Sequence, residues 1–197
     1  MITKTLDCGP AVNVVLGLIT EQDQDAEAYF TAKGLPDAAQ DTCLAPVLAR
    51  PIRTSLQYFA RILAYCELLK QGSKVLNTGH ISLSHTPGAV AIAWGYPEKF
   101  EGVGVDIEHK KRCIGPELER YFIAPEDSQT GLDRLSIWCL KEAAFKCLDA
   151  FQRSLVLRDI TIRPLSDGKF LCQTADRSCT VQLLDSEADY FVAVAWR

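Results

Sequence analysis

Residues 102–108 read Gly-Val-Gly-Val-Asp-Ile-Glu, an apolar run that ends in two carboxylates with one residue between them. The run is short, β-branched and turn-bounded, which is typical of a strand. Side chains alternate across a strand, so we expect Asp106 and Glu108 to point to the same face. Two hard oxygen donors close together suit magnesium, which a couple of carboxylates commonly hold together with water and substrate phosphates. Charged residues at the solvent end of an ordinary strand are the alternative interpretation.

Residues 138–146 read Trp-Cys-Leu-Lys-Glu-Ala-Ala-Phe-Lys, a strongly helical segment. Glu142 and Lys146 are four positions apart, so they share one face of the predicted helix. An ordinary exposed ion pair explains this spacing equally well, and it would be worth roughly a few tenths of a kcal/mol. Trp138 is similarly open to two interpretations, as an anchor in the core or as a ligand contact.

Periodicity along the rest of the chain predicts both helices and strands. Turn signals such as residues 166–168, Ser-Asp-Gly, separate the later segments. Helices are predicted at about 53–71, at 116–122 and at about 132–150, and strands at 81–85, 89–94, 103–108, 156–162, 169–174, 179–184 and 190–196.

The two halves of the chain resemble each other, because Ala-Val-Ala-Ile-Ala-Trp at 89–94 is similar to Val-Ala-Val-Ala-Trp at 192–196. A long helix also precedes the closing strands of each half. We therefore predict an α+β fold in which two similar halves, residues 1–99 and 100–197, pack as a pseudo-dimer within one chain. The alternative is that alternating alanine and valine merely suit any half-buried strand.

Composition narrows the class of protein. With 197 residues, 48% of them hydrophobic, the chain is long enough to bury a core, and its net charge of -4 gives no indication of binding to nucleic acid or an anionic membrane. Without a convincing signal cleavage site or a run of about 20 apolar residues, we expect a cytoplasmic protein. The eight cysteines are scattered, which favours reduced thiols in the core over four disulfides, particularly for the helical Cys66, Cys139 and Cys147.

The two opening segments, taken in their order and spacing, resemble the two-part signature of the 4'-phosphopantetheinyl transferase superfamily. Residues 103–106 match its first part, residues 138–146 match its second, and Glu142 follows Asp106 by 36 positions (142 minus 106). The chain length and the upstream Ile-Ser-Leu-Ser-His at 81–85 resemble the Sfp-type subgroup, whose members are monomeric pseudo-dimers. The resemblance implies the 4'-phosphopantetheinyl transferase fold.

The resemblance also implies a role for each matching residue. Asp106, Glu108 and Glu142 would bind magnesium, with manganese as the alternative ion, while Glu142 and Lys146 would act in catalysis. The contacts to the phosphates of coenzyme A would come from Arg53, Thr54, Lys74, Ser84, His85, Lys141 and Lys146. From the residues alone, a hydrogen-bonded histidine at a strand end is the favoured interpretation of His85, and Arg53 is equally explained as a solvated side chain.

The implied reaction moves the phosphopantetheine arm of coenzyme A to a serine of an apo acyl, peptidyl or aryl carrier protein and releases 3',5'-ADP. Nucleotide and phosphate contacts would lie in residues 1–99, and the metal site and catalytic helix in residues 100–197. Lys110, Lys111 and Arg112 would steer an acidic carrier protein, or would simply form a solvated loop. A metal-dependent hydrolase of coenzyme A or a related nucleotide, and a non-catalytic coenzyme A-binding module, are the competing hypotheses.

Overall fold

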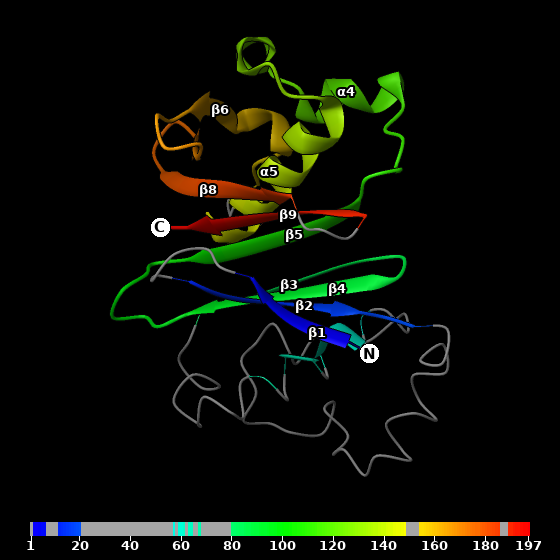
Figure 1. The fold of residues 1–197 in the computed structure, drawn as a ribbon. Coiled ribbons are helices and arrows are strands. Elements are labelled where there is room, and N and C mark those ends of the chain that lie inside the picture. The colour runs from blue at the N-terminus through cyan, green and yellow to red at the C-terminus, as the bar shows by residue number, and fades with distance from the viewer. Residues whose placement is uncertain are drawn as a thin grey trace. The chain divides into compact units, whose positions relative to one another are not determined.

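The computed structural model describes residues 2–6, 12–20, 57, 59–61, 63–64, 67, 80–148, 154–185 and 189–197 (Figure 1). The chain divides into two compact units, Met1–Lys99 and Phe100–Arg197, which are called unit 1 and unit 2 below. Each unit contains its own antiparallel sheet, so the protein is a sheet-rich α+β fold, as predicted. None of the helices in the described ranges is long and apolar enough to cross a membrane.

In the described part of unit 1, four antiparallel strands form a sheet in the order β1-β2-β4-β3. The strands are β1 (Ile2–Leu6), β2 (Asn13–Leu18), β3 (His80–Thr86) and β4 (Ala89–Gly95). β4 lies between β2 and β3, and all of its residues are buried. The hairpin between β3 and β4 turns through Pro87 and Gly88, where Gly88 has a φ of 83° that glycine adopts without strain.

The predicted strands at 81–85 and 89–94 are confirmed as β3 and β4. Within the predicted helix at 53–71, the described residues 57, 59–61, 63–64 and 67 are helical, and the remainder lies outside the described residues. β1 and β2 were not predicted. Four of the five residues in β1 are exposed, so no period-2 apolar pattern marks it.

Unit 2 contains a five-stranded antiparallel sheet in the order β5-β9-β8-β7-β6. The strands are β5 (Val103–His109), β6 (Thr161–Pro164), β7 (Phe170–Gln173), β8 (Ser178–Asp185) and β9 (Tyr190–Trp196). The helices described in this unit are α4 (Pro116–Phe122) and α5 (Arg134–Cys147), with the 3-10 turns η2 (Pro125–Thr130) and η4 (Leu157–Asp159). α5 packs against β5, β9 and β8, and its buried side chains join those of the sheet in one core (Figure 1).

Most elements of unit 2 lie where the sequence predicts them, but the strand predicted at 156–162 is wrong in its first half. Residues 157–159 form η4 instead, and the strand begins only at Thr161. The carboxylate of Asp159 accepts a hydrogen bond from the backbone nitrogen of Val156 at 2.8 Å, which closes this turn. A short polar side chain that bonds nearby backbone competes with strand pairing, which explains the difference.

Two glycines at the start of the β5 segment bring α5 close to the strand. A Cβ atom at Gly104 would collide with the carbonyl oxygen of Ala143 and lie 2.8 Å from the backbone nitrogen of Cys147. A Cβ atom at Gly102 would collide with the carbonyl oxygen of Cys147. Because side chains alternate along a strand, the even-numbered residues of β5 face α5. Asp106 therefore points toward this helix.

The similarity of the two halves is visible only in part. Each unit has an alanine- and valine-rich strand inside its sheet, β4 in unit 1 and β9 in unit 2, and these are the two strands whose sequences resemble each other. The strand orders of the two sheets differ. The packing of the halves as a pseudo-dimer stays a prediction.

Candidate active site

Two acidic side chains of β5 are buried on the face that meets α5. Asp106 and Glu108 are each 5% exposed, and they continue the face on which Gly104 contacts the helix. The apolar Val105 and Ile107 point to the opposite face and are also buried, so the strand is covered on both sides. Buried carboxylates need hydrogen bonds or cations, because the loss of water otherwise disfavours their charged form.

Lys146, near the end of α5, supplies one such cation. Its Nζ donates to Oδ1 of Asp106 at 2.9 Å and to the backbone oxygen of Val105 at 2.8 Å. Burial alone would lower the pKa of Lys146, but the charges of Asp106 and Glu142 outweigh it, so the pKa is raised above its ordinary value. Lys146 is therefore a protonated lysine at neutral pH, fixed beside Asp106.

Glu108 is held by two other side chains. Trp138 donates from Nε1 to Oε1 of Glu108 at 3.0 Å, and the Nη1 group of Arg112 donates to the same oxygen. The Arg112 guanidinium also lies 5.1 Å from the centre of the Trp138 ring, a cation–π distance. Burial raises the pKa of Glu108 and the charge of Asp106 adds to this, while the bonds from Arg112 and Trp138 act in the opposite direction.

Glu142 lies on α5 between the two residues that contact β5. It is four positions after Trp138 and four before Lys146, so the three form one stripe along the helix. Burial raises the pKa of Glu142, the charge of Lys146 opposes this shift, and the charges of Asp106 and Glu108 add to it. The charges of Asp106 and Glu108 on β5 therefore act on Glu142 of α5.

The donor set suits a hard divalent cation, although the side chains are not arranged around one. Three carboxylates, at Asp106, Glu108 and Glu142, face two basic groups, at Lys146 and Arg112. Burial raises the pKa of Glu108 and of Glu142, and the charge of Asp106 adds to both shifts. A bound magnesium ion would neutralise this negative charge. Among the described residues, no three His, Cys, Asp or Glu side chains are grouped to hold a metal ion. Magnesium binding by the three carboxylates stays a prediction.

The part of unit 2 that carries β5 and α5 matches a known protein family. Residues 102–195 match the family model of the 4'-phosphopantetheinyl transferase superfamily. The matched residues lie within unit 2 and include both β5 and α5. No curated protein matches the chain.

The match to the 4'-phosphopantetheinyl transferase superfamily supports a transferase that handles phosphopantetheine. It covers slightly less than half of the chain, because unit 1 lies outside it. The finer assignment to the Sfp-type subgroup depends on unit 1 and stays a prediction.

Lys141, which the superfamily resemblance assigned to phosphate binding, lies apart from the other site residues. Its side chain is 0% exposed, and its Nζ donates to Oδ2 of Asp127 at 2.5 Å and to the backbone oxygen of Phe122 at 2.7 Å. Burial lowers the pKa of Lys141, whereas the bond to Asp127 raises it. To contact a phosphate, Lys141 would have to leave both partners.

The remaining predicted contacts belong to unit 1. Ser84 is buried and His85 is exposed, since neighbouring residues of β3 point to opposite faces of the sheet. Arg53, Thr54 and Lys74 lie outside the described residues. The phosphate contacts of all five residues stay predictions.

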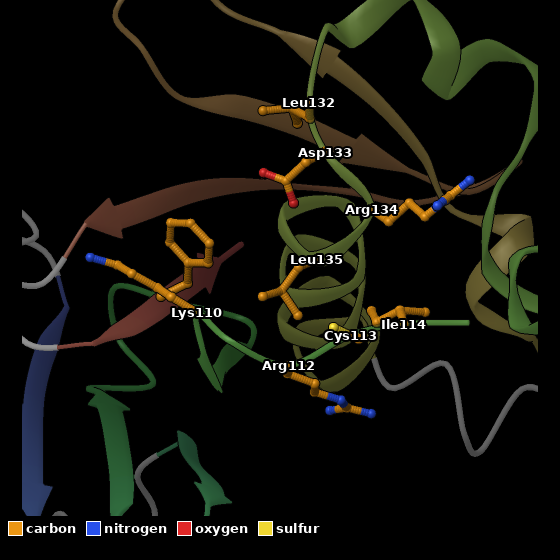
Figure 2. Close-up of a pocket in the computed structure, with 9 residues that line it drawn as sticks. Lys110, Arg112, Cys113, Ile114, Leu132, Asp133, Arg134 and Leu135 are labelled. Atoms are coloured by element: carbon orange, nitrogen blue, oxygen red, sulfur yellow. The ribbon is translucent and has the colours of Figure 1, made fainter. Parts of the chain in front are cut away.

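A pocket of about 730 Å³ opens on the surface of unit 2 (Figure 2). Arg112, which bonds Glu108, is part of its wall. The lining combines basic and apolar side chains with one carboxylate: Lys110, Arg112, Cys113, Ile114, Leu132, Asp133, Arg134, Leu135 and Phe191. Sequence reasoning singled out Lys110 and Arg112 but missed the others, which come from three separate parts of the chain and share no motif.

Two further contacts of the site were not predicted. Arg112 bonds Glu108 from a turn after β5, and the ring of Phe122 lies against Trp138 with 5.2 Å between ring centres. The four-residue spacing of Glu108 and Arg112 is a signal only in a helix, and these residues are not helical. No sequence signal connects Phe122 with Trp138.

Proposed function

We propose that this protein transfers the phosphopantetheine arm of coenzyme A to a serine of a carrier protein, with magnesium as cofactor and 3',5'-ADP as leaving product. One observation carries the proposal: Asp106 and Glu108 of β5 face the Trp138, Glu142 and Lys146 stripe of α5. This pairing lies inside the region that matches the 4'-phosphopantetheinyl transferase superfamily.

In the proposed reaction, the serine oxygen forms a bond to the β-phosphorus of coenzyme A, and the bond from that phosphorus to the bridging oxygen breaks. When bound by Asp106, Glu108 and Glu142, magnesium would act as a Lewis acid and neutralise charge on the phosphates. In a phosphoryl transfer of this kind, positioning and charge neutralisation supply most of the acceleration. Lys146 remains protonated and offers positive charge beside Asp106, where it would stabilise charge that develops on the bridging oxygen.

Glu142 is the proposed acceptor of the serine proton. Its pKa is raised by burial, which makes it a stronger base than an exposed glutamate. A carboxylate that also binds a cation is a poorer base, so relay of the proton through a water molecule is the alternative route. Both routes need Glu142 at its position opposite β5.

The substrates would be bound by different parts of the chain. Arg53, Thr54, Lys74, Ser84 and His85 are the proposed contacts to the phosphates of coenzyme A. An acidic apo acyl, peptidyl or aryl carrier protein would be steered by the basic side chains after β5, of which Lys110 and Arg112 line the pocket.

Mass spectrometry of apo carrier proteins tests the proposal directly. The protein is incubated with coenzyme A, magnesium and one of several fatty-acid, polyketide or peptide-synthetase carriers, and the carrier should gain one phosphopantetheinyl group. A carrier whose acceptor serine is replaced by alanine is the control, and it should gain nothing. Release of 3',5'-ADP without any carrier would instead indicate the hydrolase, and no transfer to any carrier would reject the proposal.

A further inference from the structure

Lys141 and Asp127 form an ion pair that is closed off from solvent. Both side chains are 0% exposed, and the Nζ of Lys141 is 2.5 Å from Oδ2 of Asp127. The same nitrogen donates to the backbone oxygen of Phe122 at 2.7 Å. Each buried charge depends on the other, since removing one partner leaves the second without compensation in the core.

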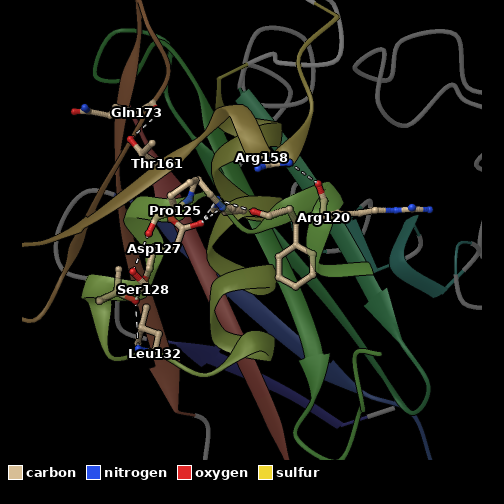
Figure 3. A network of polar contacts seen from close by, with 12 residues as sticks. Arg120, Pro125, Asp127, Ser128, Leu132, Arg158, Thr161 and Gln173 are labelled. Atoms are coloured by element: carbon tan, nitrogen blue, oxygen red, sulfur yellow. Dashed lines mark hydrogen bonds and ion pairs between the residues drawn. The ribbon is translucent and has the colours of Figure 1, made fainter. Parts of the chain in front are cut away.

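This ion pair holds the segment that joins α4 to η2 against α5. Oδ2 of Asp127 also accepts a hydrogen bond from the backbone nitrogen of Ala124 at 2.7 Å, and the nitrogen of Asp127 donates to the Ala124 oxygen at 3.1 Å. Figure 3 shows Asp127 at the centre of a polar network in η2 that also includes Pro125 and Ser128. One ammonium group therefore holds Phe122, the last residue of α4, and the start of η2.

From Phe122 a short series of contacts leads to the candidate active site. The Phe122 ring is fully buried and meets the Trp138 ring edge to face, with 5.2 Å between centres and 82° between planes. Trp138 in turn donates from Nε1 to Glu108 at 3.0 Å. An indole that is fixed by an aromatic neighbour presents its N–H group in one direction.

We propose that Lys141 is a positioning residue, which fixes the orientation of Glu108 through Phe122 and Trp138. The proposal rests on the proposed function, because the orientation of Glu108 matters for transfer only if Glu108 binds the metal. It gives separate roles to Lys141 and Glu142, which are adjacent in the sequence but have different surroundings. Successive residues of a helix differ by about 100° in direction, so Glu142 faces β5 while Lys141 anchors the opposite segment.

The orientation of Trp138 can be measured without metal or substrate. The full chain is labelled with 5-fluorotryptophan, and its three tryptophans give separate ¹⁹F resonances, of which that of Trp138 is identified by its loss in Trp138→Phe. The test variant combines Lys141→Met with Asp127→Asn, which removes both charges and keeps an oxygen for the Ala124 nitrogen. We expect the Trp138 resonance to shift by more than its linewidth, and those of Trp94 and Trp196 to stay in place.

A matched control is available in the same unit. Lys169 and Asp167 form an exposed ion pair at 2.6 Å, and Lys169→Met with Asp167→Asn makes the same chemical change there. The control should leave the Trp138 resonance in place, and an equal shift in the control would contradict the proposal. An unshifted Trp138 resonance in a folded Lys141→Met/Asp127→Asn protein would overturn it.

Two further measurements complete the test. If the double variant does not melt cooperatively, Phe122→Leu is tested instead, because it leaves the buried ion pair intact and removes only the aromatic ring. An unmoved Trp138 resonance in Phe122→Leu would then overturn the proposal. In the folded variant, a magnesium titration followed by the same resonance should show severalfold weaker binding. The fluorine experiment needs neither magnesium nor a carrier protein. A negative fluorine result therefore contradicts only the positioning role of Lys141, whereas the transfer assay on the wild-type protein detects failure of the proposed function.

Discussion

Lys146 on α5 and Asp106 on β5 are joined by a hydrogen-bonded ion pair, with 2.9 Å between Nζ and Oδ1. The carboxylate is almost completely buried and the lysine is partly exposed, so the pair is intermediate between a surface and a core salt bridge. The pair connects a proposed metal ligand to the helix that carries the proposed base. Its removal should therefore affect stability and transfer together.

Lys146→Met should lower the free energy of unfolding by about 1–3 kcal/mol, because Asp106 then keeps a buried charge without its cation. Transfer to a carrier protein should be lost as well. Chemical denaturation and the mass-spectrometric assay measure the two effects. Lys169→Met, which breaks an exposed pair in the same unit, should leave the free energy of unfolding nearly unchanged and retain transfer. Equal losses of stability in the two variants would contradict the prediction.

Glu142→Gln should stabilise the metal-free protein at neutral pH. Burial raises the folded pKa of Glu142 above 4.5, and Lys146 of α5 and Arg112 after β5 oppose this shift, whereas Asp106 and Glu108 of β5 reinforce it. The folded state then binds the proton more tightly than the unfolded chain, so this group lowers stability as the pH rises from 4.5 through the folded pKa.

The corresponding measurement is a series of thermal melts with chelator between pH 4.5 and 8. The melting temperature of Glu142→Gln should exceed that of the wild type at pH 7, and the difference should shrink toward the acidic end. Transfer by this variant should fall by at least about 100-fold, because the proposed base is removed. A melting difference that is constant across the pH range would contradict the proposed cause.

Gly104→Ala should separate α5 from β5. The new Cβ atom would collide with the Ala143 carbonyl oxygen, which is backbone and cannot rotate away, so we expect a loss of about 1–3 kcal/mol and of transfer. Gly131→Ala is the comparison variant: it has open space but a φ of 70°, so it costs about 1 kcal/mol without moving α5. Folded Gly131→Ala protein should retain full transfer per molecule.

Arg112→Gln should strengthen magnesium binding, since the guanidinium and the cation would compete for Glu108. The Arg112 side chain is 40% exposed, and an ion pair of this kind is worth at most about 1 kcal/mol, which corresponds to about a fivefold change in affinity. Isothermal titration with magnesium alone measures this change. Weaker binding in the variant would show that Arg112 supports the metal site rather than competing with the metal.

The described cysteines should differ sharply in reactivity toward thiol reagents. Cys113 is exposed, whereas Cys139, Cys147, Cys172 and Cys179 are buried. Burial raises the pKa of Cys172 to about 12, so its thiol stays protonated and unreactive at pH 8. Peptide mapping after brief maleimide treatment should find label on Cys113 and not on these four. Rapid native labelling of Cys172 would contradict its burial.

The elements of unit 2 that carry the candidate site were predictable because short-range patterns determine them. Alternation along β5 places Asp106 and Glu108 on one face, and helical spacing places Glu142 and Lys146 on one stripe. The prediction of cysteines in the core is confirmed for Cys139, Cys147, Cys172 and Cys179, but it is wrong for Cys113, which is exposed. These inferences need only the period of the local structure.

Other features depend on contacts between distant residues, which a single sequence does not encode in any local pattern. The bonds from Lys141 to Phe122 and Asp127 cross 19 and 14 positions, and only the packing of α4 and η2 on α5 brings these residues together. β1 has no apolar face to mark it, and η4 replaced the first half of a predicted strand, where one side-chain hydrogen bond closes the turn. The phosphate contacts predicted for unit 1 also combine residues that no local period connects.

The close approach of α5 to Gly102 and Gly104 has a consequence for how this protein tolerates mutation. Main-chain atoms, rather than side-chain rotamers, set the separation of strand and helix at this point. The apolar residues behind α5 can therefore exchange with others of similar volume, and the repacking need not alter the spacing between Asp106 and Glu142. Substitutions in the core therefore need not disturb the acidic site, as long as Gly102 and Gly104 are both kept.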